Sequence, residues 1–235
     1  MIRIGVTGTD TGVGKTVVSC AIAAALARRP LDVSVLKPVE TGVDFDDPDR
    51  DGARLMRAAG GSRPLSIAAP FVFRDPLAPT VAAEREGKRL TVEQLDRAVA
   101  RAADGADVLI VEGAGGLLVP VVDRFAFDAL FARWQLEVVL VAANRLGVIN
   151  HTRLTLAAVR AAGLTARVVV LNQLAEEADS SAASNAQVIS DLEHVRVVAL
   201  PWLVDPDDLV SARAAVERSG LVEAAVNAQR YSVTT

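Results

Sequence analysis

The sequence predicts a doubly wound α/β fold with a mainly parallel sheet and helices on both faces. Three observations predict it: short apolar, β-branched runs recur along the chain, helical segments separate them, and 51% of the 235 residues are hydrophobic. Continuous apolar strands are typical of a parallel sheet that is buried on both faces. We therefore expect a single domain over residues 1–235, with a frayed tail at residues 229–235.

The expected elements alternate along the chain. Strands are expected at Ile2–Thr7, Val33–Leu36, Val108–Val111, Val138–Ala142, Ala166–Leu171 and Val195–Leu200. Helices are expected at Val17–Arg28, Asp51–Ala59, from a capping box at Thr91 and Gln94 to about Ala103, at His151–Ala162 and from Asp207 or Asp208 onward. Residues 60–79 contain four prolines and little periodicity, which indicates an irregular excursion over the surface. Ligands of such folds bind at the carboxyl ends of the strands.

Composition argues against several classes of function. A formal net charge of -4 gives no reason to expect a nucleic-acid partner. We expect a cytoplasmic protein that does not bind a membrane, because no apolar run approaches the length of a span and no signal peptide is recognisable. The lone cysteine, Cys20, fits a reducing compartment. His151 and His194 have no partner at metal-ligand spacing, so no zinc site is expected.

The first chemical motif is GTDTGVGKT, Gly8–Thr16, between an expected strand and an expected helix. Glycines let successive backbone N–H groups converge on phosphate oxygens, and the helix N-terminus adds a positive dipole. In this context Lys15 is expected to reach the β- and γ-phosphates of ATP, and the Thr16 hydroxyl to bind magnesium. Five residues separate Gly8 from Gly14 instead of the usual four. A tight strand-to-helix turn with a chance lysine is the alternative interpretation.

Two further loops follow expected strands. Lys37 begins KPVETG, where it could face the same ligand as Lys15 or be a surface lysine. Glu112 begins EGAGG after an apolar strand, an arrangement in which a carboxylate helps to hold magnesium, although a capping glutamate is the alternative. Asp51 precedes a helix, and the residues alone favour a helix N-cap over a metal ligand.

Together the motifs resemble the dethiobiotin synthetase family, ATP-dependent carboxylases of biotin synthesis. The resemblance rests, in chain order, on Gly8–Thr16, KPVETG, Pro76–Ala82, EGAGG, LGVINH at Leu146–His151, Asn172 and Pro201–Leu203. It implies a P-loop NTPase fold, a homodimer with sites at the subunit interface, and the substrates 7,8-diaminononanoate, CO2 or bicarbonate, and ATP with Mg²⁺. One amine would capture CO2 as a carbamate, ATP would phosphorylate the carbamate, and the second amine would close the ring to dethiobiotin.

The resemblance also implies roles for individual residues. Catalytic residues would be Lys37, Lys15 and Thr11. Magnesium would be bound by Thr16, Asp51 and Glu112. The substrate would be bound by Thr41 and by Leu146, Gly147, Val148, Ile149 and Asn150, the last five acting across the dimer interface. ATP would be bound by Gly12, Val13, Gly14, Lys15, Thr16, Val17, Asp51, Glu112, Gly113, Ala114 and Gly115 and, at the adenine, by Asn172, Gln173, Pro201, Trp202 and Leu203. Asp47 and Asp49 remain alternatives to Asp51, because the acidic loop aligns loosely.

A partition or positioning ATPase that assembles on DNA or membrane is the alternative function. Such proteins carry a signature lysine five residues before the loop lysine, and this chain has Asp10 there. The dethiobiotin synthetase interpretation is therefore preferred.

Overall fold

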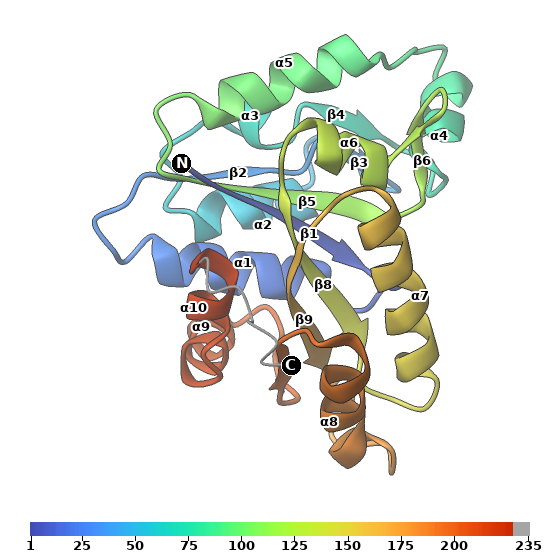
Figure 1. Cartoon of the computed structure of the whole chain (residues 1–235). Coiled ribbons are helices and arrows are strands. Elements are labelled where there is room, and N and C mark those ends of the chain that lie inside the picture. Colours follow the sequence, from blue (N-terminus) through green and yellow to red (C-terminus); the bar gives the residue numbers. More distant parts are fainter. Residues whose placement is uncertain (228–235) are drawn as a thin grey trace.

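Six parallel strands form the central sheet, in the order β10-β9-β8-β1-β5-β2 (Figure 1). The structure is a computed structural model, and it describes residues 1–227. The sheet strands are β1 (Ile2–Gly8), β2 (Val33–Leu36), β5 (Val108–Gly116), β8 (Glu137–Ala143), β9 (Ala166–Asn172) and β10 (Val197–Leu200). The chain runs outward from β1 to β2 and later crosses to β8 on the other side, so the strand order reverses at β1, where an α/β sheet binds its ligand.

Helices cover both faces of this sheet (Figure 1). They are α1 (Lys15–Leu26), α2 (Asp51–Ala58), α3 (Leu65–Ala68), α4 (Pro79–Arg85), α5 (Val92–Ala103), α6 (Phe127–Arg133), α7 (Val148–Ala161), α8 (Ala182–Glu193), α9 (Leu209–Arg218) and α10 (Leu221–Val226). Helices α1, α2, α9 and α10 share one hydrophobic core, and α5, α6, α7 and α8 share the other. Successive side chains of β5 point to opposite faces of the sheet, so this strand contributes to both cores. Val108 and Ile110 belong to the first core, and Leu109 and Val111 belong to the second. The predicted doubly wound fold is confirmed.

Element bounds differ from expectation in informative places. The expected loop at Glu112–Gly116 is wrong, because β5 stays paired with β1 as far as Gly8 and Gly116. Helix α7 begins at Val148 rather than His151, since Gly147 adopts a left-handed conformation with φ 91° and starts the helix there. The irregular excursion expected over residues 60–79 holds α3 and β4 (Phe71–Phe73), and β4 pairs with β3 (Val39–Thr41).

Several smaller expectations can also be settled. The capping box is confirmed: the Gln94 N–H donates to Thr91 Oγ1, and the Thr91 N–H donates to Gln94 Oε1. Asp208 caps α9. The hairpin of β6 (Pro120–Val122) and β7 (Phe125–Ala126), together with helices α4, α6, α8 and α10, was not predicted. The predicted frayed tail lies outside the described residues.

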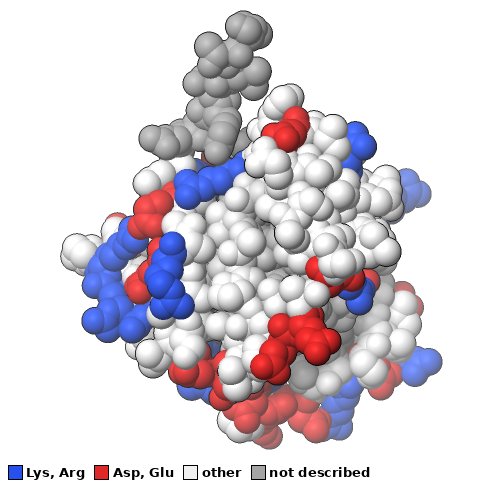
Figure 2. Space-filling view, turned by 90° about the horizontal axis from the view of Figure 1, so that it is seen from below, with Lys and Arg blue, Asp and Glu red and all other residues white. Residues whose placement is uncertain are grey.

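The surface carries charges of both signs. In the view of Figure 2, acidic and basic side chains lie around a largely uncharged centre. Within residues 1–227, no helix combines the length and apolar character that crossing a membrane requires.

Candidate active site

The loop from Gly8 to Thr16 joins β1 to α1 at the carboxyl edge of the sheet. Gly14 has φ 92°, and a Cβ built there would lie 2.2 Å from Asn172 Nδ2, so any other residue would be strained and would displace Asn172. Instead Asn172 reaches the loop from β9 and donates from Nδ2 to the Val13 carbonyl at 3.1 Å. The Lys15 ammonium lies under the loop and donates to the Asp10 carbonyl at 2.9 Å.

Lys37 occupies the centre of a charged cluster beside this loop. Its Nζ lies 2.8 Å from Asp51 Oδ2 and 2.5 Å from Glu112 Oε1. The Thr16 hydroxyl donates to the same Glu112 oxygen at 2.8 Å. Strands β1, β5 and β2 are neighbours, so the residues that follow them meet at one edge. The interpretation of Lys37 as a surface lysine is wrong, because only 4% of it is exposed.

The cluster fixes the charges of Lys37 and Asp51. Burial alone would lower the pKa of Lys37, but the carboxylates of Glu112 and Asp51 raise it above its ordinary value. Burial would likewise raise the pKa of Asp51, yet the Lys37 ammonium outweighs it and lowers that pKa. Lys37 is therefore an ammonium and Asp51 a carboxylate at neutral pH. Asp51 is the first residue of α2, whose N-cap is Arg50, so the N-cap interpretation of Asp51 is wrong.

A buried ion pair supports this cluster from behind. The Glu40 carboxylate pairs with the Arg50 guanidinium, and its Oε1 accepts the Gly52 N–H at 2.8 Å. Gly52 follows Asp51 directly, and a Cβ on it would lie 2.3 Å from that of Ala69. Glu40 and Arg50 thus hold the first turn of α2, and with it Asp51, at the end of β2. Sequence reasoning assigned neither residue a role.

Lys37 and Asp51 of the cluster line a cavity of about 750 Å³ together with residues of the loop. Among the residues predicted to form the site, it is lined by Thr11, Gly12, Gly14, Lys15, Thr16, Val17, Lys37, Thr41, Asp51, Ala114 and Gly115. Pro76 and Pro79, from the Pro76–Ala82 motif, also line the cavity. Of the three aspartates considered as metal ligands, Asp51 lies in this cavity, whereas Asp49 pairs with Arg57 outside it. The structure thus brings residues of the Gly8–Thr16, KPVETG and EGAGG motifs together around one cavity.

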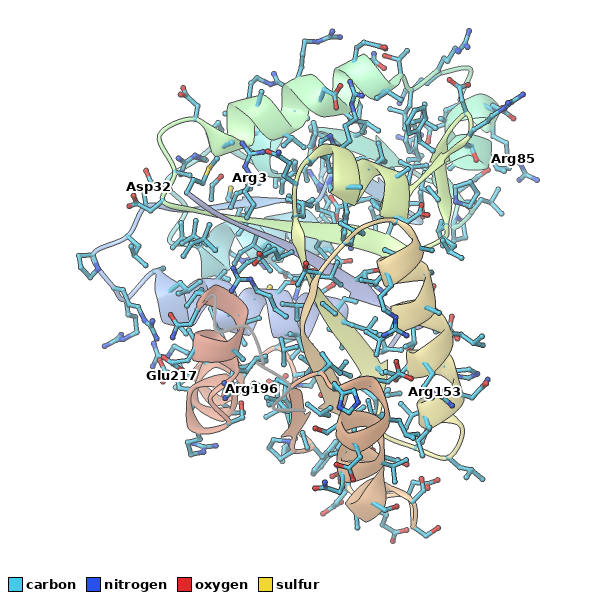
Figure 3. All side chains as sticks on the ribbon, in the orientation of Figure 1. Arg3, Asp32, Arg85, Arg153, Arg196 and Glu217 are labelled. Atoms are coloured by element: carbon cyan, nitrogen blue, oxygen red, sulfur yellow. The ribbon has the colours of Figure 1, made fainter. Side chains whose placement is uncertain are left out.

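The remaining predicted residues do not line this cavity. Gly147, Ile149 and Asn150 line a separate cavity of about 560 Å³ with Arg153, which projects from α7 (Figure 3). Leu146 precedes α7, and Val148 is buried at its start. Glu112 and Gly113 lie within β5, and a Cβ on Gly113 would face Phe127. Gln173, Pro201, Trp202 and Leu203 lie in loops that follow β9 and β10, beyond Asn172.

The Lys15 ammonium has a shifted pKa. Burial, reinforced by the positive charge of Lys37, lowers the pKa of Lys15 to about 8. A bound phosphate would keep Lys15 charged, so binding above pH 8 takes up a proton. We predict that the ATP association constant falls by up to about tenfold per pH unit above pH 8. Titration calorimetry in buffers of different ionisation enthalpy measures this proton uptake, and Lys15→Arg should remove it, because arginine stays protonated. A pH-independent wild type would contradict the assignment.

The fold and the loop together define a P-loop ATPase. Residues 3–208 match the family model described as AAA domain. Among solved structures, the chain is similar to a ParA family ATPase from Chlorobium tepidum TLS (TM-score 0.53, 14% identity, 94% of each chain covered). It is also similar to the MinD cell division protein of Aquifex aeolicus (TM-score 0.55, 12% identity, 95% of each chain). At these identities the likeness concerns the fold alone.

Curated relatives show to which family of P-loop ATPases the chain belongs. The ATP-dependent dethiobiotin synthetase BioD of Anaeromyxobacter dehalogenans (strain 2CP-C) is 42% identical over 210 residues, covering 89% of this chain and 93% of that protein. The protein of the same name from Bacillus subtilis (strain 168) is 37% identical over 187 residues, covering 80% and 81%. The chain belongs to the ATP-dependent dethiobiotin synthetase family, whose members are ligases.

Proposed function

We propose that this enzyme uses Mg-ATP and CO2 to convert 7,8-diaminononanoate into dethiobiotin, ADP and phosphate. The observation that carries the proposal is the Lys37 cluster, which places a buried ammonium and two carboxylates beside the phosphate loop of a dethiobiotin synthetase family member. Such an arrangement suits the activation of an anionic acceptor by ATP. An enzyme that consumes ATP and carries a single, buried free cysteine is expected to act in the cytoplasm.

The donor set of the cluster fits magnesium. Thr16, Asp51 and Glu112 offer a hydroxyl and two carboxylates, the hard oxygen donors that Mg²⁺ prefers. Glu112 Oε2 is buried and has no hydrogen-bond partner among residues 1–227, so one oxygen is free to accept a cation. When bound with ATP, the ion would neutralise charge on the phosphates.

The chain's own groups can account for each chemical step. One substrate amine adds to CO2 and loses a proton to give a carbamate, whose negative charge Lys37 would balance. A carbamate oxygen then attacks the γ-phosphorus while Lys15 and the loop N–H groups hold the phosphates, and ADP leaves. The second amine attacks the carbamate carbon and gives up a proton, phosphate leaves and can carry that proton away, and the cyclic urea forms. Thr11 and Thr41 line the cavity where they can hydrogen-bond the substrate.

The adenine is proposed to bind beyond Asn172. Asn172 contacts the loop at Val13 and lies between the phosphate loop and the segments after β9 and β10. Gln173, Pro201, Trp202 and Leu203 belong to those segments and would surround the base. This assignment follows from family membership, and the neighbourhood of Asn172 and Gly14 supports it.

A second subunit is proposed to complete the site. Leu118, Leu146 and Leu154 are large apolar side chains with 61%, 80% and 63% exposure. Leu118 and Leu154 line a cavity with Thr9 and Thr11, so this apolar surface adjoins the phosphate loop. A partner seated there would bring its Leu146–Asn150 segment toward the substrate carboxylate.

We predict a homodimer by analytical ultracentrifugation, and a shift to monomer when Leu118 and Leu154 are both changed to aspartate. The paired change places charge in an apolar contact and should also lower turnover, because the site would be incomplete. Leu192→Asp, on an exposed leucine of α8, is the matched control and should remain dimeric. A wild-type enzyme that sediments as a monomer at assay concentration would overturn the dimer.

ADP release provides the first test of the proposed reaction. With ATP, magnesium and bicarbonate present, ADP should form in a manner that depends on added 7,8-diaminononanoate. A partition-type ATPase, the alternative function, would instead form ADP faster when DNA or lipid vesicles are added. Diamine-independent ADP formation that DNA or lipid increases would replace the proposal with that alternative.

A further inference from the structure

Arg54 belongs to the nucleotide cavity although no motif includes it. It lies one turn after Asp51 on α2 and lines the main cavity together with Thr16 and Val17. Thr16 and Val17 lie in the first turn of α1, at the end of the loop whose backbone N–H groups would cradle the α- and β-phosphates in the proposed complex. Asp207, the partner of Arg54, follows the proposed adenine segment Pro201–Leu203 along the chain, so in the proposed complex the Arg54 side chain lies toward the nucleoside side of the triphosphate.

The Arg54 guanidinium pairs with Asp207, which lies in the loop between β10 and α9. This pair also bounds a smaller cavity of about 210 Å³, formed by Val17, Cys20 and Leu209 among others. Arg54 thus stands between two cavities that share Val17. The Arg54 side chain is 23% exposed and that of Asp207 68%, so the pair is of the solvent-exposed kind that contributes little stability.

A phosphate is a stronger partner for Arg54 than Asp207 is. The planar guanidinium matches phosphate oxygens in bidentate geometry, and its bonds strengthen where water is excluded. The other two cations of the cavity are already engaged: Lys37 with two carboxylates, and Lys15 with the Asp10 carbonyl beneath the loop. Arg54 has its single described ionic partner on an exposed loop, from which it can be released.

We propose that Arg54 is a nucleotide-binding residue that leaves Asp207 and binds the α-phosphate side of ATP. Asp207 holds the guanidinium at the cavity wall until nucleotide arrives. The exchange ties α2, which carries Asp51, to the bound nucleotide. This inference rests on the proposed ATP site, and it adds a phosphate ligand from outside the loop.

The test compares dissociation constants for ATP, ADP and adenosine by titration calorimetry. Arg54→Gln should raise the dissociation constants for ATP and ADP by about tenfold, because a charged hydrogen bond to phosphate is lost. The dissociation constant for adenosine should not change. Arg57→Gln is the matched control: Arg57 lies on the same helix and bounds the smaller cavity, but it bonds Asp49 and the Pro48 carbonyl. Its affinities should equal those of the wild type.

Asp207→Asn should have the opposite effect and lower the dissociation constant for ATP by about threefold, since it frees Arg54. In the Arg54→Gln background the same change should have no effect, which separates release of Arg54 from general repulsion of the nucleotide. Wild-type affinity in Arg54→Gln, or equal tightening by Asp207→Asn in both backgrounds, would overturn the inference. Failure of the wild type itself to bind ATP would instead overturn the proposed function.

Discussion

Replacing Lys37 with glutamine is expected to lower turnover by at least about 100-fold while ATP still binds. Lys37 is the buried ammonium at the centre of the cluster, 2.5 Å from Glu112 and 2.8 Å from Asp51. Charge that develops on a carbamate and a γ-phosphate would lose its preorganised partner, an effect of about 10²–10³ in comparable sites. Lys15 and the loop backbone can still contact the phosphates when Lys37 is replaced, so nucleotide affinity should change much less.

The measurement is steady-state product formation beside calorimetric ATP binding. Lys88→Gln makes the same chemical change at an exposed lysine paired with Glu86, and it should leave both quantities unchanged. Because Lys37→Gln removes a buried charge, its fold is checked by circular dichroism before turnover is compared. A folded Lys37→Gln enzyme with near wild-type turnover would show that Lys37 is not catalytic.

Changing Glu40 to alanine is expected to lower the free energy of unfolding by about 3–5 kcal/mol. Glu40 and Arg50 are both almost fully buried, and Arg50 also donates from Nε to the Phe45 carbonyl at 3.1 Å. Removal of Glu40 leaves the Arg50 guanidinium as an unpaired buried charge and deprives the Gly52 N–H of its acceptor. The first turn of α2 would loosen, so activity should fall with stability.

Urea unfolding followed by fluorescence measures the loss. Asp49→Asn is the control in the neighbouring loop that carries Arg50, since it removes one member of an exposed pair with Arg57 and should cost less than about 1 kcal/mol. Replacing both Glu40 and Arg50 with apolar residues should recover part of the loss, because no charge is then left unpaired. Equal stabilities for Glu40→Ala and Asp49→Asn would show that the buried pair has no special role.

The sequence was sufficient to predict the strand-end part of the site. Lys37 follows a strand, Thr16 comes after the loop at the end of another, and Glu112 lies directly after a third continuous apolar run. Parallel strands bring such positions to one edge of the sheet. The resemblance to the family was needed to include Asp51 among the candidate site residues, because an aspartate at the start of a helix serves equally well as a helix cap. The roles of Glu40 and Arg50 were not predictable, since they depend on the path of an irregular acidic loop and on burial that local pattern does not encode.

Other parts depend on contacts between distant or separate segments. The pairing of β3 with β4 joins residues about thirty positions apart through an irregular stretch, so neither short strand carries a pattern of its own. Leu146–Asn150 lie outside the main cavity of a single chain, and the substrate role proposed for them requires a second subunit. The Arg54–Asp207 pair links helix α2 to a loop more than 150 residues later.

The most direct measurement of the central claim is mass spectrometry of the product formed from ¹³C-bicarbonate. The enzyme is mixed with ATP, magnesium, labelled bicarbonate and 7,8-diaminononanoate, and ADP is quantified in the same sample. The account predicts dethiobiotin that is one mass unit heavier than the unlabelled compound, with one ADP formed per product molecule. Absence of labelled dethiobiotin, with ADP formed at the same rate whether or not the diamine is present, would contradict it.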